Sequence, residues 1–198
     1  MQRTQISIVA KCNPIKNRLI QAMDALILSC LVLLPAGKTL QAQEASASPY
    51  LTAKLNSLNQ VPAVLAPSSG RFLARINADD TISFSLTYAN MSSAVTQAHI
   101  HFGASRTNGG VAVFLCGGKK PACPVWGTVT GVITAADVSR LPVNNGDSVI
   151  PQGLTPGDLG GLLEAIRAGD TYVNVHTANF PSGELRGQIE AAGQSAAH

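Results

Sequence analysis

Residues 71–88, RFLARINADDTISFSLTY, decide the fold class of this chain. Apolar and polar side chains alternate in residues 71–77 and again in residues 81–88, and Ala78, Asp79 and Asp80 lie between the two segments. Successive side chains of a β-strand point to opposite faces, so an alternation of period two gives a strand one apolar face and one polar face. The stretch therefore predicts an antiparallel β-hairpin whose apolar faces cover a core.

Short segments of the same kind follow on both sides of this hairpin. Prolines and glycines separate them, which indicates turns and irregular chain. We predict further strands at Tyr50–Asn56, Val95–Phe102, Val111–Cys116, Val125–Ile133, Tyr172–Thr177 and Gly183–Glu190. A capping-box spacing at residues 134–137 predicts a short helix, and a second helix is expected after Thr155 as N-cap, ending at Gly169. The pattern predicts an all-β protein, an antiparallel Greek-key sandwich or barrel with one or two short helices in its crossovers.

The first 47 residues have the composition of a targeting segment. Lys11, Lys16 and Arg18 precede the apolar run of residues 25–34, and small residues follow at positions 42–47. We interpret residues 1–47 as a signal peptide and linker, cleaved after Ala42 or Ala47, and an uncleaved anchor stays open as an alternative. Residues 48–191 are then the domain and residues 192–198 a frayed tail. The expected location is the periplasm or the outside of the cell.

The charge of the chain depends on this leader. The whole chain has a formal charge of +3, but residues 1–42 hold five of the basic residues and one acidic residue. The remaining nine basic and ten acidic residues leave the domain close to neutral. We therefore expect no nucleic-acid partner and no membrane surface once the leader is removed.

The domain contains two cysteines, Cys116 and Cys123. An exported protein is in an oxidising compartment, so we expect them to form a disulfide across a hairpin tip. A thiolate metal pair is the alternative, but six intervening residues are not a usual zinc spacing.

Three of the four histidines lie in two of the predicted strands. His99 and His101 share one face of their strand because they are two residues apart, and His176 lies on the polar face of the strand at 172–177. The polar face of the strand at 183–190 carries Glu184, Arg186 and Gln188. If these strands are neighbours in one sheet, the side chains meet on its polar side.

Two interpretations of this cluster stay open at this point. Three neutral imidazoles can bind copper or zinc, with Glu184 and Asn174 as outer hydrogen-bond partners and Arg186 as a guide for an anion. Alternatively, the imidazoles form hydrogen bonds that join the strands, on a polar sheet face exposed to water.

A series of motifs in fixed order resembles the CHRD domain of chordin and of many bacterial exported proteins. The motifs span roughly residues 50–190 and include Asn59–Pro62, Ala98–His101, Asn108–Val111, Gly127–Gly131, Tyr172–Thr177 and Pro181–Ile189. The resemblance implies an extracytoplasmic β domain, and in chordin the domain belongs to a binding protein of the extracellular matrix. It implies no established activity.

Part of the same series also resembles copper–zinc superoxide dismutases. His99 and His101, then His176, then Gly183 with Arg186 stand in the order of that family's first copper ligands, later histidine and arginine. This resemblance implies an immunoglobulin-like or superoxide-dismutase-like sandwich, copper on the histidines and an anion beside Arg186. The chain has no histidine between His101 and His176 to bridge two metals and no second cluster for zinc.

We therefore expect an exported binding module with a three-histidine copper or zinc site, whose partner is an extracellular protein or a small anion. Binding is favoured over catalysis. The alternatives are a copper-dependent oxidoreductase similar to superoxide dismutase and a structural matrix or surface module without metal. The sequence does not specify the oligomeric state.

Overall fold

The computed structural model describes residues 48–125, 127–138 and 152–192. The predicted leader, most of the loop at 141–153, Trp126 and most of the tail lie outside these ranges. Nine strands and one α-helix make up the described part, with two short 3-10 turns at Ser57–Asn59 and Ala135–Asp137. The strands are β1 (Tyr50–Asn56), β2 (Ser69–Ile76), β3 (Ile82–Ala89), β4 (Val95–Phe102), β5 (Gly110–Cys116), β6 (Gly127–Ile133), β7 (Thr171–Thr177), β8 (Leu185–Gln188) and β9 (Glu190–Ala191).

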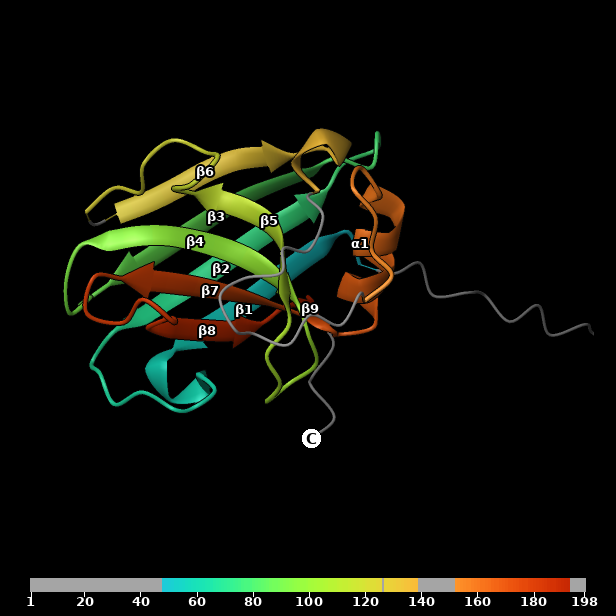
Figure 1. The fold of residues 1–198 in the computed structure, drawn as a ribbon. Coiled ribbons are helices and arrows are strands. Elements are labelled where there is room, and N and C mark those ends of the chain that lie inside the picture. The colour runs from blue at the N-terminus through green and yellow to red at the C-terminus, as the bar shows by residue number, and fades with distance from the viewer. Residues whose placement is uncertain (1–47, 126, 139–151, 193–198) are drawn as a thin grey trace, which may run out of the picture. The chain divides into compact units, whose positions relative to one another are not determined.

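All nine strands belong to one antiparallel sheet, in the order β5-β4-β7-β8-β1-β2-β3-β6, with β9 beside β1. The sheet curls until its two end strands, β5 and β6, come into contact, so it forms a nearly closed barrel. In Figure 1, β4, β7 and β8 lie in front of β1, β2 and β3. The predicted all-β antiparallel class is confirmed.

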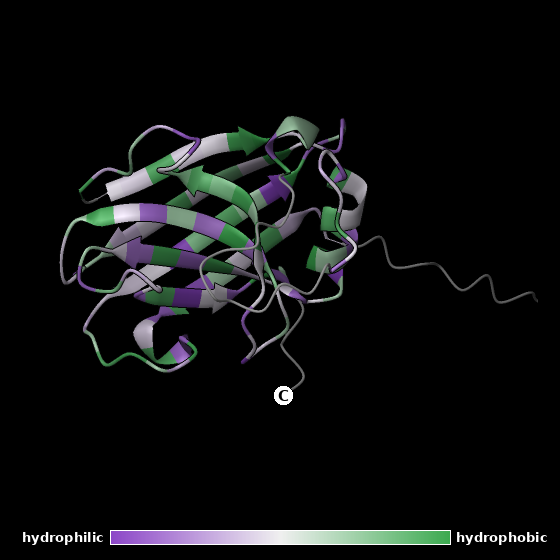
Figure 2. Ribbon diagram, in the orientation of Figure 1, coloured by the Kyte–Doolittle hydropathy of each residue, from purple (hydrophilic) through white to green (hydrophobic). Residues whose placement is uncertain are grey.

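The predicted hairpin is present as β2 and β3, paired from Ser69 with Ala89 to Ile76 with Ile82. Its alternation has the expected consequence, because the apolar face is buried and the other face is more exposed. Phe72 of β2 stacks on Phe84 of β3 with the ring centroids 6.0 Å apart. The same alternation is visible along the strands in Figure 2. The barrel interior is filled by apolar side chains from both halves of the sheet, including Leu51, Leu55, Leu86, Ile100, Val113, Ile133, Val173, Val175 and Leu185.

The α-helix α1 (Leu159–Arg167) begins three residues later than predicted. Its N-cap is Asp158, whose carboxylate accepts a hydrogen bond from the Gly161 amide, so the prediction of Thr155 as the cap is wrong. Gly157 has a φ of 83°, a left-handed conformation that breaks a helix and places the start after it. Leu162, Leu163 and Ile166 pack on the core. Within the described ranges, no helix is long and apolar enough to cross a membrane.

The closing strand predicted at residues 183–190 is divided in two. β8 pairs with β7 and, through Arg186 and Asn56, with β1, whereas β9 pairs only with β1. Ile189 lies between them, and its amide donates to the carbonyl of Thr171. β7 is therefore paired along both edges, with β4 on one side and β8 on the other.

The predicted disulfide is confirmed. Cys116 at the end of β5 is bonded to Cys123, and their Cα atoms are 5.0 Å apart. Between them the chain turns tightly, with the Gly117 amide donating to the carbonyl of Pro121. Just beyond the disulfide, the buried hydroxyl of Tyr88 donates to the carbonyl of Pro124 at 2.6 Å, and burial raises the pKa of this phenol to about 12.

A buried three-histidine cluster as a candidate metal centre

The pairing of β4 with β7 brings the three predicted histidines together. His99 lies opposite Asn174, and His176 lies opposite Gln97, so the two histidines are diagonal neighbours on one face of the sheet. His101 lies two residues further along β4, opposite Tyr172. The ring centroid of His99 is 4.9 Å from that of His176 and 5.4 Å from that of His101. The expectation that separate strands join these side chains on one face of the sheet is met.

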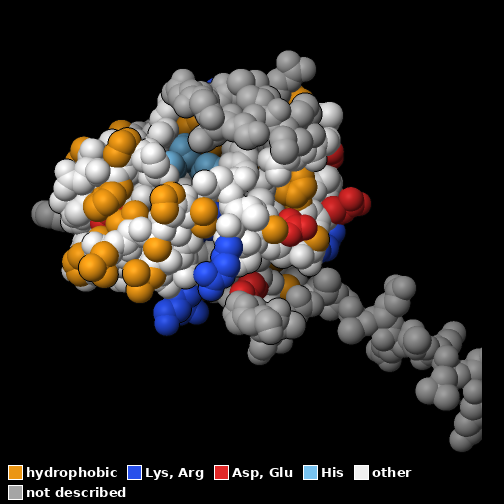
Figure 3. Space-filling view, turned by 60° about the horizontal axis from the view of Figure 1, so that its bottom comes forward, with side chains coloured by type: hydrophobic (Ala, Val, Ile, Leu, Met, Phe, Trp, Pro, Cys, Tyr) orange, Lys and Arg blue, Asp and Glu red, His pale blue; other side chains and the backbone are white. Residues whose placement is uncertain are grey.

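This face is not the solvent-exposed surface that one interpretation of the sequence assumed. His99, His101 and His176 are only 3%, 8% and 7% exposed. The ring of Phe114, from β5, meets His99 edge-on with the centroids 4.4 Å apart, and Tyr172 stacks on His101 at 4.7 Å. Figure 3 shows a small area of imidazole at the surface, surrounded by other side chains. The cluster is therefore largely shielded from water.

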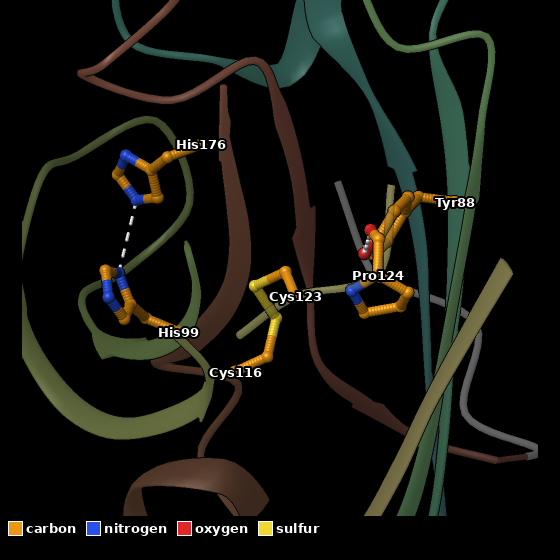
Figure 4. Close-up of a disulfide and its surroundings, with 6 residues drawn as sticks. All are labelled: Tyr88, His99, Cys116, Cys123, Pro124 and His176. Carbon is orange, nitrogen blue, oxygen red and sulfur yellow. Dashed lines mark hydrogen bonds between the residues drawn. A yellow bond between two sulfur atoms is a disulfide. The ribbon is translucent and has the colours of Figure 1, made fainter. Parts of the chain in front are cut away.

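Backbone carbonyls fix two of the imidazoles. Nδ1 of His101 is 2.9 Å from the carbonyl oxygen of Gly109, and Nδ1 of His176 is 2.9 Å from that of Pro181. A carbonyl can only accept, so each Nδ1 carries the hydrogen and each Nε2 presents a lone pair. Nδ1 of His99 lies 3.2 Å from Nε2 of His176, as the dashed line in Figure 4 marks.

The Gly109 carbonyl is held in place by its surroundings. A side chain at position 109 would overlap the backbone carbonyl of Phe102, so only glycine fits there. The Gly109 amide donates to the hydroxyl of Tyr172 at 3.2 Å. The same tyrosine that stacks on His101 thus also holds the residue whose carbonyl sets the tautomer of His101.

Two imidazole nitrogens in the cluster have no hydrogen-bond partner among the residues that the structure describes. These are Nε2 of His99 and Nε2 of His101, and both are buried among the described residues. A buried polar atom without a partner costs about 1–3 kcal/mol, so the described part of the chain leaves this cluster incompletely satisfied.

The electrostatic environment keeps the imidazoles neutral. Burial lowers the pKa of His99 to about 2, with repulsion from His176 and His101 adding to the effect. Burial also lowers the pKa of His101 to about 3, although the Gly109 carbonyl opposes the shift. For His176 burial again lowers the pKa, against the opposing hydrogen bond to Pro181. Neutral imidazole is the form that binds a metal ion.

The spacing of the nitrogens is close to that of a metal site. One ligand nitrogen from each histidine lies within 4.8 Å of the other two. A tetrahedral ion with bonds of about 2.0–2.1 Å holds its ligand atoms roughly 3.3 Å apart. The 3.2 Å between His99 Nδ1 and His176 Nε2 is the length of a hydrogen bond, and His176 would have to exchange this bond for the ion.

Glu184 and Asn174 form hydrogen bonds away from the imidazoles. The Glu184 carboxylate accepts from the amide and hydroxyl of Ser92 and from the hydroxyl of Thr177. Burial acts to raise the pKa of Glu184, but these hydrogen bonds outweigh it and the net shift is downward. Asn174 accepts from the side-chain amide of Gln60 at 2.7 Å. Among the described residues, the hydrogen bonds from Nδ1 of His101 and of His176 go instead to the carbonyls of Gly109 and Pro181.

Arg186 lies one aromatic ring away from the cluster. Its guanidinium carbon is 3.5 Å from the centroid of the Tyr172 ring, and Tyr172 in turn contacts His101. Nη2 of Arg186 donates to the carbonyl of Ala104 at 3.1 Å. Sequence reasoning missed Tyr172, although it lies on the same face of its strand as Asn174 and His176. It also missed Phe114, which lies on a different strand and gave no such signal.

The fold and this site together define an antiparallel β domain with a buried cluster of three histidines. A family model of the CHRD domain matches residues 51–189, so the chain belongs to the CHRD domain family. This confirms the resemblance seen in the sequence. No curated protein and no solved structure gives a significant match.

Proposed function

We propose that this CHRD domain is a metal-binding module that holds one copper or zinc ion on His99, His101 and His176. The observation that carries the proposal is the pair of buried, unpartnered Nε2 atoms beside a third imidazole at ligand spacing. A cation bound here would satisfy lone pairs for which the described residues supply no donor.

The alternative, in which the imidazoles only join the strands by hydrogen bonds, explains the cluster less well. A structural cluster of this kind requires every buried donor and acceptor to have a partner. Within the described ranges, only one hydrogen bond joins two of the imidazoles. The Nε2 atoms of His99 and His101 have no hydrogen-bond partner among these residues. The carbonyls of Gly109 and Pro181 instead orient two rings in the way that outer partners orient metal ligands.

The three imidazole ligands restrict which metal ions can bind. Imidazole suits copper and zinc, whereas magnesium and calcium prefer oxygen ligands. Three protein ligands leave a further coordination position open, as in catalytic zinc sites. This open position supports the second candidate, a copper-dependent oxidoreductase, which a superoxide-dismutation assay of the copper-loaded protein would test.

The disulfide supports an extracytoplasmic location as part of the proposal. Cys116 and Cys123 are bonded, and stable disulfides form mainly in oxidising compartments. A metal-binding module there would meet a partner outside the cytoplasm, either an extracellular protein or a small anion.

The test is metal stoichiometry by elemental analysis and calorimetric titration, on the chain purified without a polyhistidine tag. We expect about one copper or zinc per chain. The double variant His99→Gln/His101→Gln should lose this metal while keeping the circular dichroism of the wild type. His198→Gln removes the one histidine outside the cluster and is the matched control that should keep the metal. A folded wild type that takes up no metal, or a double variant that binds it equally well, would overturn the proposal.

A further inference from the structure

A pocket of about 630 Å³ lies beside the histidine cluster, and none of the three histidines lines it. Its walls come from β1, the segment Leu58–Ala63, the β4–β5 loop and the strands β8 and β9. This volume is in the range of small-molecule sites. The charged residues among its lining are Lys54, Arg106, Arg186 and Glu190.

Arg186 is the unusual member of this lining. It is only 2% exposed, and Nη1 of its guanidinium is buried with no hydrogen-bond partner in the described ranges. No carboxylate of the described residues forms a salt bridge with it, since the one such ion pair joins Lys120 to Asp137. A buried charge is normally paired, so an unpaired guanidinium at a pocket wall indicates a missing anionic partner.

Several neutral polar groups around the pocket are already engaged. Both hydrogens of the Gln188 amide are donated, to the carbonyls of Gly103 and Gly169. The amide nitrogen of Gln60 donates to Asn174, and that of Asn59 donates to the backbone carbonyl of Arg186. Arg186 is the buried charged donor of this lining, and a buried charge favours an anionic ligand.

The stacking of Arg186 on Tyr172 suits this role. A guanidinium stacked on a ring keeps its in-plane N–H groups available, and their planar arrangement matches the oxygens of a carboxylate or phosphate. Lys54 and Arg106 are exposed and line the same pocket, so they would attract the same charge, with only Glu190 opposing them.

We propose that this pocket binds a small ligand through an oxyanion group, a carboxylate or a phosphate, with Arg186 as the buried anchor and Lys54 and Arg106 at the rim. The site is separate from the proposed metal centre and does not need the metal. Its test therefore uses metal-free protein, so that failure of one proposal leaves the other standing.

The experiment titrates the chelator-treated full-length chain with inorganic phosphate and with acetate at constant ionic strength, followed by nuclear magnetic resonance. We expect saturable shifts at the Arg186 side chain and at the backbone amides of Ser105 and Arg106, with sodium chloride and glycerol producing none. The stronger of the two probes identifies the class of oxyanion. Shifts that chloride reproduces, or that occur away from the pocket, would overturn the proposal.

Variants separate the anchor from general charge. Arg186→Lys keeps the charge but loses the planar donor group, and it should weaken binding about tenfold. Arg71→Gln removes an exposed cation of β2 outside the pocket and should bind as the wild type does. If Arg186→Lys does not fold, the double variant Lys54→Gln/Arg106→Gln is titrated in its place. It should bind the oxyanion more weakly than the wild type, and unchanged binding would contradict the proposal.

Discussion

At the scale of single residues, the polar side of the sheet contains two separate arrangements. The three imidazoles are buried, neutral and incompletely hydrogen-bonded, which is the state of a ligand set. Glu184, only eight residues from His176, is by contrast fully hydrogen-bonded by Ser92 and Thr177. The first arrangement favours binding, and the second stabilises the fold.

Glu184→Gln should lower the free energy of unfolding by about 1–3 kcal/mol at pH 7, because charge-assisted hydrogen bonds are lost in a buried site. The folded state holds the pKa of this carboxyl below its ordinary value. Its stabilisation is therefore complete above the unfolded pKa and is lost as the pH falls through the folded pKa. Urea denaturation at pH 7 and below pH 4 measures both effects.

Glu164→Gln is the matched control for this variant, since Glu164 is an exposed residue of α1. It should change the stability by less than about 0.5 kcal/mol. Equal effects of the two variants would show that the Ser92 and Thr177 hydrogen bonds add nothing.

The metal-free protein should lose stability as the pH falls from 7 to 5. Unfolded histidines bind protons with a pKa of about 6.5, whereas burial holds the pKa of His99 at about 2 and that of His101 at about 3 in the fold. The unfolded state then binds more protons, so each buried histidine costs up to about 1.4 kcal/mol per pH unit below 6.5.

Denaturation curves at pH 7, 6 and 5, measured in chelator, test this dependence. His198→Gln should show the same loss as the wild type. A stability that stays constant between pH 7 and pH 5 would mean that the imidazoles are protonated as freely in the fold as in the unfolded chain.

At the scale of elements, the sheet order explains how the site forms. β7 lies between β4 and β8, so it joins the segment that carries His99 and His101 to the segment that carries Arg186. His99 and His176 are 77 residues apart in the sequence and become neighbours only through this pairing. The contact of β5 with β6 nearly closes the sheet, with the disulfide-linked connection between these two strands.

Period-two alternation predicted most strands within one or two residues, because each strand buries one face. It also placed His99, His101 and His176 on polar faces. It could not predict that these faces are buried, because their cover comes from Phe114 of β5 and from chain segments such as that of Gly109. Glu184 was assigned to the histidines from alternation alone, whereas Ser92 and Thr177 are its hydrogen-bond partners.

Removal of the disulfide should destabilise the domain by about 2–3 kcal/mol, the loop-closure estimate for a short loop. Cys116 and Cys123 enclose the tight connection between β5 and β6, and Lys120 within it forms an ion pair with Asp137. The variant Cys116→Ala/Cys123→Ala, compared by thermal unfolding with the wild type in oxidised and reduced form, measures the effect. If the reduced wild type unfolds at the same temperature as the oxidised protein, the disulfide does not stabilise this connection.

At the scale of the whole molecule, a single curled sheet carries the two proposed sites, which differ in their chemistry. The proposed metal centre lies on β4 and β7, and the proposed oxyanion pocket lies on the other side of Tyr172, along β1 and β8. A metal bound only by the folded chain would stabilise it by about 2.7 kcal/mol at a free concentration of 100 times the dissociation constant. The domain would thus be both a receptor for the metal and more stable in its presence.

The measurement that tests the central claim most directly is anomalous diffraction from crystals of the full-length chain loaded with zinc or copper, recorded at the absorption edge of the metal. The account predicts one anomalous peak bonded to imidazole nitrogens of His99, His101 and His176, at about 2.0–2.1 Å. A peak at another place in the chain, or no peak in a well-ordered crystal with metal in excess, would contradict it.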